Sequence, residues 1–544
     1  MARTEMPTSV EALQELVIQQ QALLDQNAAV IEVNQSTITE QAALISFYRE
    51  WKRLMDSQRF GSRSERLVPE QGRLFNEAES LATQEEDDEN DAITVPSHTR
   101  KKRGRRPLPD FLPVHEILHD LSEDEKVCAH DASHTLVEIS RETSDQLKFI
   151  PATVEILRHV RPKYACPTCK EGVKIAPMPK LPIPKSIATP SLLAHVATSK
   201  YVDGLPLYRQ EKIFQRLGVD VSRATLASWM VKMGDLVEPL MDRIRDEIRA
   251  GSFVQCDETP FQVLKEPGKR AQSQSYLWVL RAGEPDHPLV YYEYDPSRSS
   301  EVPKRLLRGF KGFMQTDGYK GYDALGKLPG IVHVGCFAHA RRKFDEALRG
   351  QGKSRKSKSS PKESVARQGL KRINKLYELE RLWRGASPDE RYAFRQEKTK
   401  PKLEQLKQWL TASKERVPPT SLTGEALAYL ESQWPKLERV LDDGRISLDT
   451  NAVERCIRPF VIGRRNWLFA DTPKGATASA RLYSLVETAK ANGLEPWTYL
   501  ATIFEKLPAA ASAAEIEALL PGRIEMGDLR TATRLPHPPH ASSG

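Results

Sequence analysis

Three carboxylates occupy positions in this sequence where a shared metal site could form. Asp257 and Asp317 each follow an extended apolar stretch, and Glu454 lies in the first turn of a short helical segment. Hard ions such as Mg²⁺ or Mn²⁺ prefer carboxylate and phosphate oxygens. Two such ions, roughly 3.5–4 Å apart, support phosphoryl transfer. We therefore predict that Asp257 bridges two ions, while Asp317 and Glu454 each hold one.

Each of these acids also has an ordinary structural explanation. Asp257 could cap the Thr-Pro turn, Asp317 could belong to an Asp-Gly turn, and Glu454 could belong to a capping box. Glu258 and Asp323 are competing acids close by in the sequence. Neighbouring residues of a strand point to opposite faces, which separates Asp257 from Glu258. The occurrence of all three acids in elements that one sheet needs favours the functional interpretation.

Strand and helix patterns alternate around the acids. We expect short helices at 305–310 and 338–348, between extended segments. The strand candidates are 251–257, 276–281, 288–294, 312–317 and 331–337. Three antiparallel strands followed by helix–strand alternation are the order of a ribonuclease-H-like sheet, and acids at strand ends can assemble an open site.

The segment that contains Glu454 predicts a short amphipathic helix. Asn451, Glu454 and Arg458 are spaced three and four apart and therefore share one helical face. Pro459 is predicted to end this helix directly after Arg458. Second candidates for phosphate contact are His339, Arg342, Arg458, Arg464 and Arg465. His339 could equally be a structural histidine.

Four residues have the chemistry of a structural zinc site. Cys166 and Cys169 form a CxxC pair, and Cys128 with His130 could complete a tetrahedral set. Strand-like residues at 153–165 lead into the CxxC pair. The alternative is a reduced CxxC with unrelated histidines.

Residues 187–240 contain a helix-turn-helix pattern. A helix is expected from Tyr208 to Leu217, Gly218 breaks it, and Ser222 caps a second helix that runs to Met233. The second helix could reach base edges or phosphates through Arg223, Thr225, Ser228 and Lys232. The expected shared core is Ile213, Phe214, Leu217, Val219, Leu226, Trp229 and Met230. The alternative is a helical hairpin that binds nothing.

Residues 8–58 predict one long helix with an apolar residue at every seventh position. These residues are Val10, Val17, Leu24, Ile31, Ile38 and Ile45. A seven-residue repeat over this length favours a coiled coil that joins protomers. An amphipathic helix packed on its own domain is the alternative.

Three charged runs are typical of linkers. Residues 84–91 are acidic, and 98–109 and 349–365 are basic. Arg103, Arg105 and Arg106 in the second run could enter a DNA minor groove, or the run could be a solvated tether.

The composition bounds the class of protein. The chain has 544 residues, a net charge of +8 and 39% hydrophobic residues, enough for more than one core. The six cysteines are sparse, and no stretch has the roughly 20 apolar residues of a membrane helix. We expect a cytoplasmic protein without a secretory signal, and the mild basic excess fits a polyanionic partner.

The chain resembles the insertion-sequence-66 transposase family over about residues 60 to 505. The matching motifs are FGSRSERL (60–67), GRRPLPDFLP (104–113), RPKYACPTC (161–169), SKYVDGLPLYRQEKIF (199–214), CDETP (256–260), QTDGYKGYDAL (315–325), GCFAHARRKFDEA (335–347), NAVERCIRPFVIGRRNWLF (451–469) and YSLVETAKANG (483–493).

The resemblance implies a multidomain α/β protein with a ribonuclease-H-like catalytic core and a helical insertion. It also implies an N-terminal coiled-coil helix, a small zinc-binding domain and a helix-turn-helix. It makes Asp257, Asp317 and Glu454 the Asp-Asp-Glu triad of a DNA transposase with two Mg²⁺ or Mn²⁺ ions and one structural Zn²⁺. The expected partners are double-stranded DNA, further copies of the chain and accessory proteins of the same element. The expected location is the bacterial nucleoid.

Together with the patterns above, the resemblance to this family divides the chain into eight segments. These are a coiled-coil helix (8–58), a linker (59–119), a zinc-binding domain (120–176), the helix-turn-helix (187–240), the first part of the catalytic core (250–348), a basic loop with a helical insertion (349–444), the second part of the core (445–505) and a C-terminal helix and tail (506–544).

Two other functions remain open from the sequence. The chain could be a non-catalytic DNA-binding regulator that uses the zinc and helix-turn-helix parts, although the presence of all three acids argues against it. It could also be a ribonuclease-H-like nuclease that cuts DNA without joining strands.

Overall fold

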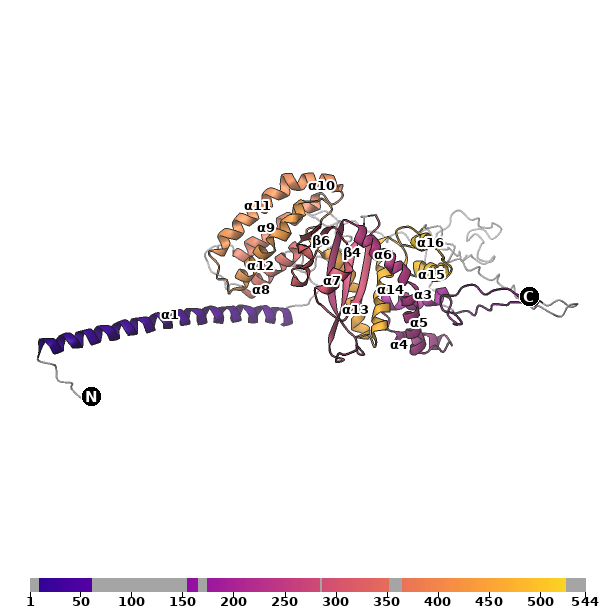
Figure 1. Ribbon diagram of the computed structural model, residues 1–544, viewed down its shortest axis with the longest axis horizontal. Helices are drawn as coiled ribbons and strands as arrows, with labels where there is room; N and C mark the ends of the chain where they lie inside the picture. The colour runs from indigo at the N-terminus through magenta and orange to yellow at the C-terminus, as the bar shows by residue number, and fades with distance from the viewer. Residues whose placement is uncertain (1–8, 61–153, 165–173, 284–285, 352–363, 525–544) are drawn as a thin grey trace, which may run out of the picture. The chain divides into compact units, whose positions relative to one another are not determined.

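A five-stranded mixed sheet lies at the centre of the computed structural model, which describes residues 9–60, 154–164, 174–283, 286–351 and 364–524. The strand order is β5-β4-β3-β6-β7, and β4 and β6 are labelled in Figure 1. The strands are β3 (Phe253–Gln262), β4 (Gln274–Ala282), β5 (Leu289–Asp295), β6 (Gly312–Gln315) and β7 (Ile331–Val334). β3, β4 and β5 form an antiparallel meander, whereas β6 and β7 run parallel to β3. β6 ends at Gln315, so Asp317 lies two residues beyond its strand and not at the strand's last position, as the sequence had predicted.

Helix α14 (Pro473–Ala491) covers the outer edge of β5. Thr488 Oγ1 accepts a hydrogen bond from the Val290 N–H (3.0 Å) and donates one to the Val290 carbonyl (2.9 Å). Ser484 Oγ accepts from the Tyr292 N–H (2.8 Å). An exposed strand edge is a template for unwanted pairing, and these side chains satisfy its backbone groups.

The first hydrophobic core joins the sheet to the helices around it. α13 (Asn451–Trp467) packs on β3 and β4, and α6 (Glu238–Ala250) packs on β5. Leu277, Val279, Phe460 and Tyr483 are among its fully buried side chains. The shorter elements of this part are α7 (Glu301–Leu306), η2 (Lys320–Tyr322), η3 (Leu325–Lys327), α15 (Pro496–Lys506) and α16 (Ala513–Glu517).

Helix α13 continues through Pro459, so the prediction that this proline ends the helix is wrong. Proline lacks an N–H and removes one helical hydrogen bond, but the residues on both sides of it hold the helix in the core. Ile457 and Phe460 are buried there. The helix ends at Trp467, before Leu468, whose φ is 67°. Tertiary burial therefore overrides a local helix breaker.

The second hydrophobic core is helical (Figure 1). It is built by α8 (Phe337–Gln351), α9 (Val365–Leu382), α11 (Lys400–Lys414) and α12 (Leu422–Leu437). Buried leucines such as Leu376, Leu406 and Leu430 line the contacts between these helices. The connecting elements are α10 (Pro388–Phe394), the π-helical turn η4 (Arg395–Thr399) and η5 (Glu438–Leu441).

Helices α3 (Pro190–Tyr201), α4 (Leu207–Arg216) and α5 (Arg223–Leu236) form a helical group that packs on α14. Gly218 adopts φ 78° in the turn between α4 and α5, and Ser222 Oγ accepts a hydrogen bond from the Thr225 N–H (3.2 Å). Phe214, Leu226, Trp229 and Met230 are buried, as predicted.

Leu217, by contrast, is 40% exposed, so its prediction as a core residue is wrong. It is the residue after the last one of α4, where the chain turns away from the shared core.

Helix α1 (Val10–Phe60) is a single continuous helix. Its last third packs against α8, where Leu54 is buried and Glu50 accepts a hydrogen bond from the Leu422 N–H (3.2 Å). Among the described side chains, the heptad residues Val17, Leu24, Ile31 and Ile38 are 55–64% exposed. The described part of the chain therefore leaves this section of the apolar stripe uncovered.

Residues 82–162 form a separate unit, of which 154–162 are described and contain no helix or strand. The strand expected at 153–165 is present only as β1 (Lys163–Tyr164), which pairs antiparallel with β2 (Lys174–Ile175). The predicted zinc ligands Cys128, His130, Cys166 and Cys169 and the basic residues Arg103, Arg105 and Arg106 lie outside the described residues. Within the described ranges, no helix has the length and apolar character that crossing a membrane requires.

Candidate active site

Parallel pairing of β3 and β6 brings Asp257, within the central strand, to the level of Asp317, just beyond the end of β6. Gln255 of β3 pairs in register with Gln315 of β6, and each aspartate stands two residues further along its chain. Side chains two apart on a strand share a face. Asp257 Oδ1 accepts a hydrogen bond from the Glu258 N–H (2.8 Å), and Asp317 Oδ1 accepts one from the Tyr319 N–H (2.9 Å). The backbone thus fixes one oxygen of each aspartate.

A buried network of glutamine side chains connects these strands to the segment before α13. Gln255 Nε2 lies 2.8 Å from Gln315 Oε1 and 3.0 Å from both Ser447 Oγ and the Asp449 carbonyl oxygen. Gln315 Nε2 donates to the carbonyls of Ser447 (2.8 Å) and Gly335 (3.1 Å). The sequence analysis missed both glutamines. Their signal is a polar residue inside each apolar strand, two residues before each aspartate.

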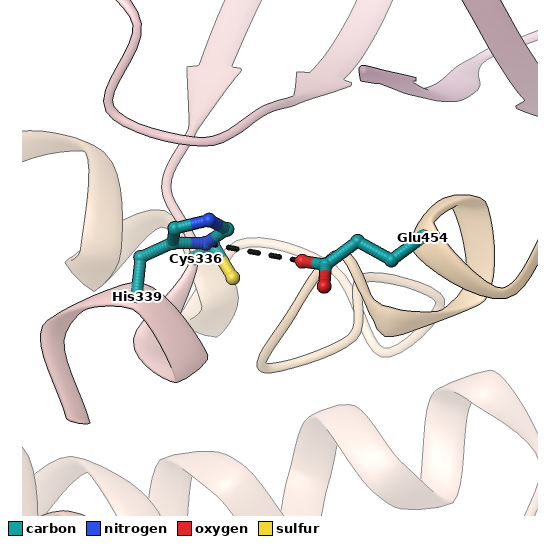
Figure 2. Close-up of side chains that lie close together, drawn as sticks. All are labelled: Cys336, His339 and Glu454. Atoms are coloured by element: carbon teal, nitrogen blue, oxygen red, sulfur yellow. Dashed lines mark ion pairs between the residues drawn. The ribbon is translucent and has the colours of Figure 1, made fainter. Parts of the chain in front are cut away.

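Glu454 lies in the first turn of α13 and points toward the start of α8 (Figure 2). Glu454 Oε1 accepts a hydrogen bond from Thr450 Oγ1 (3.0 Å) and lies 4.0 Å from His339 Nδ1. Glu454 Oε2 lies 3.8 Å from an Arg342 guanidinium nitrogen. Of the second candidates for phosphate contact, His339 and Arg342 therefore adjoin the third acid.

The three acids interact electrostatically. The pKa of Asp257 is raised well above its ordinary value, first by burial and then by the negative charges of Glu258, Asp317 and Glu454. Asp257 therefore experiences the charge of both other predicted triad members, although they come from distant parts of the chain. Crowding of carboxylates at a partly buried site is the situation that a divalent cation relieves.

The two competing acids are engaged in other interactions. Glu258 is nearly fully buried, pairs with the Arg298 guanidinium (2.7 Å) and accepts a hydrogen bond from the Tyr322 hydroxyl (2.7 Å). Asp323 pairs with Lys436 Nζ (2.6 Å). Both carboxylates therefore have cationic partners in this structure.

The triad side chains have the chemistry that a hard divalent ion prefers. Among the described residues, however, only Cys336, His339 and Glu454 bring three ligand atoms within 4.8 Å of one another, so the three acids do not all meet at that distance in this structure. All three side chains offer carboxylate oxygens, which Mg²⁺ and Mn²⁺ prefer. Asp257 and Asp317 each use one oxygen for a backbone N–H, and within the described part of the chain the structure gives no hydrogen-bond partner to the other. Each aspartate can therefore offer one carboxylate oxygen as a ligand.

The remaining predicted DNA-contact residues lie on two other surfaces. Arg458 and Arg465 are exposed on α13, and Arg464 donates a hydrogen bond to the Pro260 carbonyl. On α5, Arg223, Ser228 and Lys232 are exposed and Thr225 is partly buried. Thr225, Ser228 and Lys232 also line an open hollow of about 440 Å³ against residues 183–187. No hydrogen bond or ion pair in the described structure joins these α5 side chains to the three acids.

Comparison with protein-family models gives four matches along the chain. Residues 185–478, more than half of the chain, match "Transposase IS66 family", and residues 484–521 match "IS66 C-terminal element". Residues 125–170 match "zinc-finger binding domain of transposase IS66", which indicates a structural zinc site. Residues 48–117 match "Transposase C of IS166 homeodomain", in a stretch that the sequence analysis assigned mostly to a linker.

The chain is also similar to proteins of Sinorhizobium fredii (strain NBRC 101917 / NGR234). It is 32% identical to "Uncharacterized protein y4qI" over 542 residues, which cover 95% of this chain and 97% of that protein. It is 33% identical to "Uncharacterized protein y4jD", with 76% and 81% of the two chains covered.

Proposed function

Because this chain belongs to the IS66 transposase family and is an insertion-sequence transposase, we propose that it cleaves DNA at the ends of its element and joins the freed 3′-hydroxyls to target DNA. Asp257, Asp317 and Glu454 are the proposed catalytic triad. The observations that support this assignment most directly are geometric: Gln255 and Gln315, two residues before Asp257 and Asp317, pair in register, and Gln255 also contacts Ser447 and Asp449, just before Glu454.

Each residue of the site has a proposed role that follows from its position in the fold. Asp257, in the central strand, would bridge two divalent ions, while Asp317 and Glu454 would each hold one. Two Mg²⁺ or Mn²⁺ ions, when bound, activate the attacking water or 3′-hydroxyl and stabilise the leaving oxygen. Arg342, 3.8 Å from Glu454 and half-exposed, would hold a DNA phosphate beside the third acid. The imidazole of His339, whose Nδ1 lies 4.0 Å from Glu454 Oε1, would provide a second nitrogen for phosphate contact beside this acid.

A ribonuclease-H-like core is the fold that we propose for residues 250–348 and 445–505. Its support is the strand order β5-β4-β3-β6-β7, in which an antiparallel meander continues into two strands parallel to the first. That topology places Asp257 on the central strand, with Asp317 after the neighbouring one.

The other parts of the chain would bring DNA and further protomers to this core. We propose that α5 contacts the element ends, because Ser222 caps it and Arg223, Ser228 and Lys232 are exposed along it. The basic run with Arg103, Arg105 and Arg106 would follow the DNA backbone. Cys128, His130, Cys166 and Cys169 are the proposed Zn²⁺ ligands. The uncovered apolar stripe of α1 would pair protomers, and accessory proteins of the same element are possible further partners.

A cleavage and joining assay with labelled element ends and Mg²⁺ tests the proposal. Glu454→Gln is expected to keep end binding and to lower cleavage by at least a thousandfold, because it replaces a carboxylate ligand by a neutral amide. The matched control is Glu404→Gln, at an exposed position on α11, which should cleave at the parent rate. Cleavage by Glu454→Gln at the parent rate would falsify the triad assignment.

The products of the same assay separate the other two functions. A 3′ nick together with a joined product supports a transposase. A nick without joining would instead identify a nuclease, and a mobility shift without cleavage would identify a regulator. The nucleoid location is proposed as a consequence of DNA binding.

A further inference from the structure

A second set of metal-ligating side chains meets beside the triad. Cys336 Sγ, His339 Nδ1 or Nε2 and a Glu454 carboxylate oxygen all lie within 4.8 Å of one another (Figure 2). Cys336 directly precedes α8, His339 lies three residues later in its first turn, and Glu454 comes from α13. Residues three apart at the start of a helix lie on the same side of it, so Cys336 and His339 face Glu454 together.

This donor set differs in chemistry from that of the triad. A thiolate, an imidazole and a carboxylate are the ligands of Zn²⁺ and similar borderline ions, whereas Mg²⁺ does not take sulfur. Three protein ligands leave a fourth position of a tetrahedral ion open. The sequence analysis considered His339 only as a phosphate contact or a structural residue and gave Cys336 no role.

The three ligand atoms, which lie within 4.8 Å of one another, are at or somewhat beyond the spacing that they would have around a bound ion. Bonds of about 2.0–2.3 Å to a tetrahedral ion place the ligand atoms roughly 3.3–3.8 Å apart. His339 Nδ1 and Glu454 Oε1 are already 4.0 Å apart, and the Glu454 side chain is 29% exposed and has several rotatable bonds. Rotation of the Glu454 side chain can therefore shorten its distance to His339 to the value that a bound ion needs.

Thr450 fixes the position of the sulfur. Its backbone N–H donates a hydrogen bond to Cys336 Sγ (3.3 Å), while burial raises the pKa of the Cys336 thiol to about 12. Its hydroxyl oxygen lies 3.2 Å from Cys336 Sγ and 3.0 Å from Glu454 Oε1 and has one proton to donate. The Thr450 hydroxyl therefore lies between two of the three ligands and links their positions.

We propose that Cys336, His339 and Glu454 bind Zn²⁺ or an equally thiophilic divalent ion, and that this binding inhibits the enzyme by withdrawing Glu454 from Asp257 and Asp317. The binding part of this proposal stands on the geometry of the three side chains. The inhibitory part rests on the proposed function, in which Glu454 belongs to the triad.

Binding is tested with Co²⁺ as the probe on the full chain, after one equivalent of Zn²⁺ has filled the zinc-finger site. The parent protein is expected to bind a further equivalent of Co²⁺ and to develop a thiolate-to-cobalt absorption band. Cys336→Ser should lose this band and bind Co²⁺ at least tenfold more weakly. The control is Cys456→Ser, another buried cysteine, on α13, which should retain the band.

Two readouts keep the binding test decisive. Circular dichroism and thermal unfolding show whether Cys336→Ser is folded, and if it is not, His339→Gln replaces it, since the His339 side chain is 21% exposed. A Co²⁺ thiolate band of parent strength in either folded variant overturns the proposed site.

Inhibition is tested by DNA cleavage in Mg²⁺ with added Zn²⁺. The parent should lose activity at Zn²⁺ concentrations that rise with the Mg²⁺ concentration, and Cys336→Ser should need at least tenfold more Zn²⁺. Equal sensitivity of the two proteins overturns the inhibitory role. If Co²⁺ binds at Cys336 but no condition gives cleavage, the proposed function fails and the metal site stands. If Glu454→Gln abolishes cleavage but Co²⁺ does not bind, the proposed function stands and this site fails.

Discussion

Replacing Arg395 by methionine is expected to destabilise the helical insertion strongly. Arg395 is fully buried in the π-helical turn η4 and uses its guanidinium for five hydrogen bonds. Nε and Nη2 each donate to one Glu380 carboxylate oxygen (both 2.7 Å). Nη1 donates to the carbonyls of Val440 and Asp443 (both 2.9 Å), and Nη2 also donates to that of Ile446 (2.7 Å).

The magnitude follows from what the substitution leaves behind. Removing one partner of a buried ion pair costs about 3–5 kcal/mol, because the other charge stays buried without compensation. Glu380 is 16% exposed, so water reaches it in part and the lower half of that range is expected. Arg395→Met should therefore lower the free energy of unfolding by about 3–4 kcal/mol. In Arg395→Met/Glu380→Leu the unpaired charge is gone but three carbonyls still lack their donor, so the loss should be smaller than in Arg395→Met without vanishing.

Urea unfolding of the full chain, combined with hydrogen exchange on peptides from 400–446, measures this effect. The exchange data locate the loss, because local opening free energies differ along a chain. Arg381→Met is the control, since Arg381 is exposed on α9 and should change stability by less than about 0.5 kcal/mol. A loss below about 1 kcal/mol in Arg395→Met, or a double variant as unstable as the single one, would refute the reasoning.

Two further predictions concern acid stability and helix packing. Burial and the charge of Lys436 lower the pKa of His333 to about 4, so folding favours its neutral form. Between about pH 6.5 and 4, the unfolded chain therefore binds more protons than the folded chain does. About 3 kcal/mol of the free energy of unfolding, present above pH 6.5, is lost as the pH falls through this window. Urea unfolding at several pH values should show a shallower acid loss in His333→Gln than in His287→Gln, and equal slopes would count against this prediction. A Cβ at Gly234 would lie 2.5 Å from Ala478 Cβ, so Gly234→Ala should cost about 1–3 kcal/mol, and an unchanged thermal midpoint would contradict that close contact.

Turn-forming and helix-capping residues in the sequence were sufficient to predict several elements. Gly218 and Ser222 have intrinsic preferences for a left-handed turn and a helix cap, so the limits of α4 and α5 were predictable to within a few residues. The meander β3–β4–β5 followed from apolar strand-like runs separated by turns. Asp257 and Asp317 were singled out as candidate ligands because each was predicted to end a strand, but β3 continues past Asp257 to Gln262 and β6 ends before Asp317.

Features that depend on tertiary contacts were not predictable in this way. Pro459 was expected to end its helix, and only the burial of the residues around it in α13 shows why it does not. The contact between Gln255 and Gln315 requires the register of two strands that are 60 residues apart. Cys336 could not be grouped with Glu454, since their proximity depends on the tertiary contact of Thr450, directly before α13, with Cys336, directly before α8.

The helical insertion is part of the scaffold of the candidate site, although it separates Asp317 from Glu454 in the sequence. Tyr429 of α12 packs so closely on the residue after Asp317 that a Cβ at Gly318 would lie 2.6 Å from its hydroxyl. Lys436 of the same helix pairs with Asp323 (2.6 Å), which neutralises an acid close to the triad in the sequence. Arg395 holds the carbonyls of the segment that leads from the insertion into α13. The insertion therefore contacts the chain next to the second acid and fixes the approach to the third, so loosening it should separate the acids before the sheet itself unfolds.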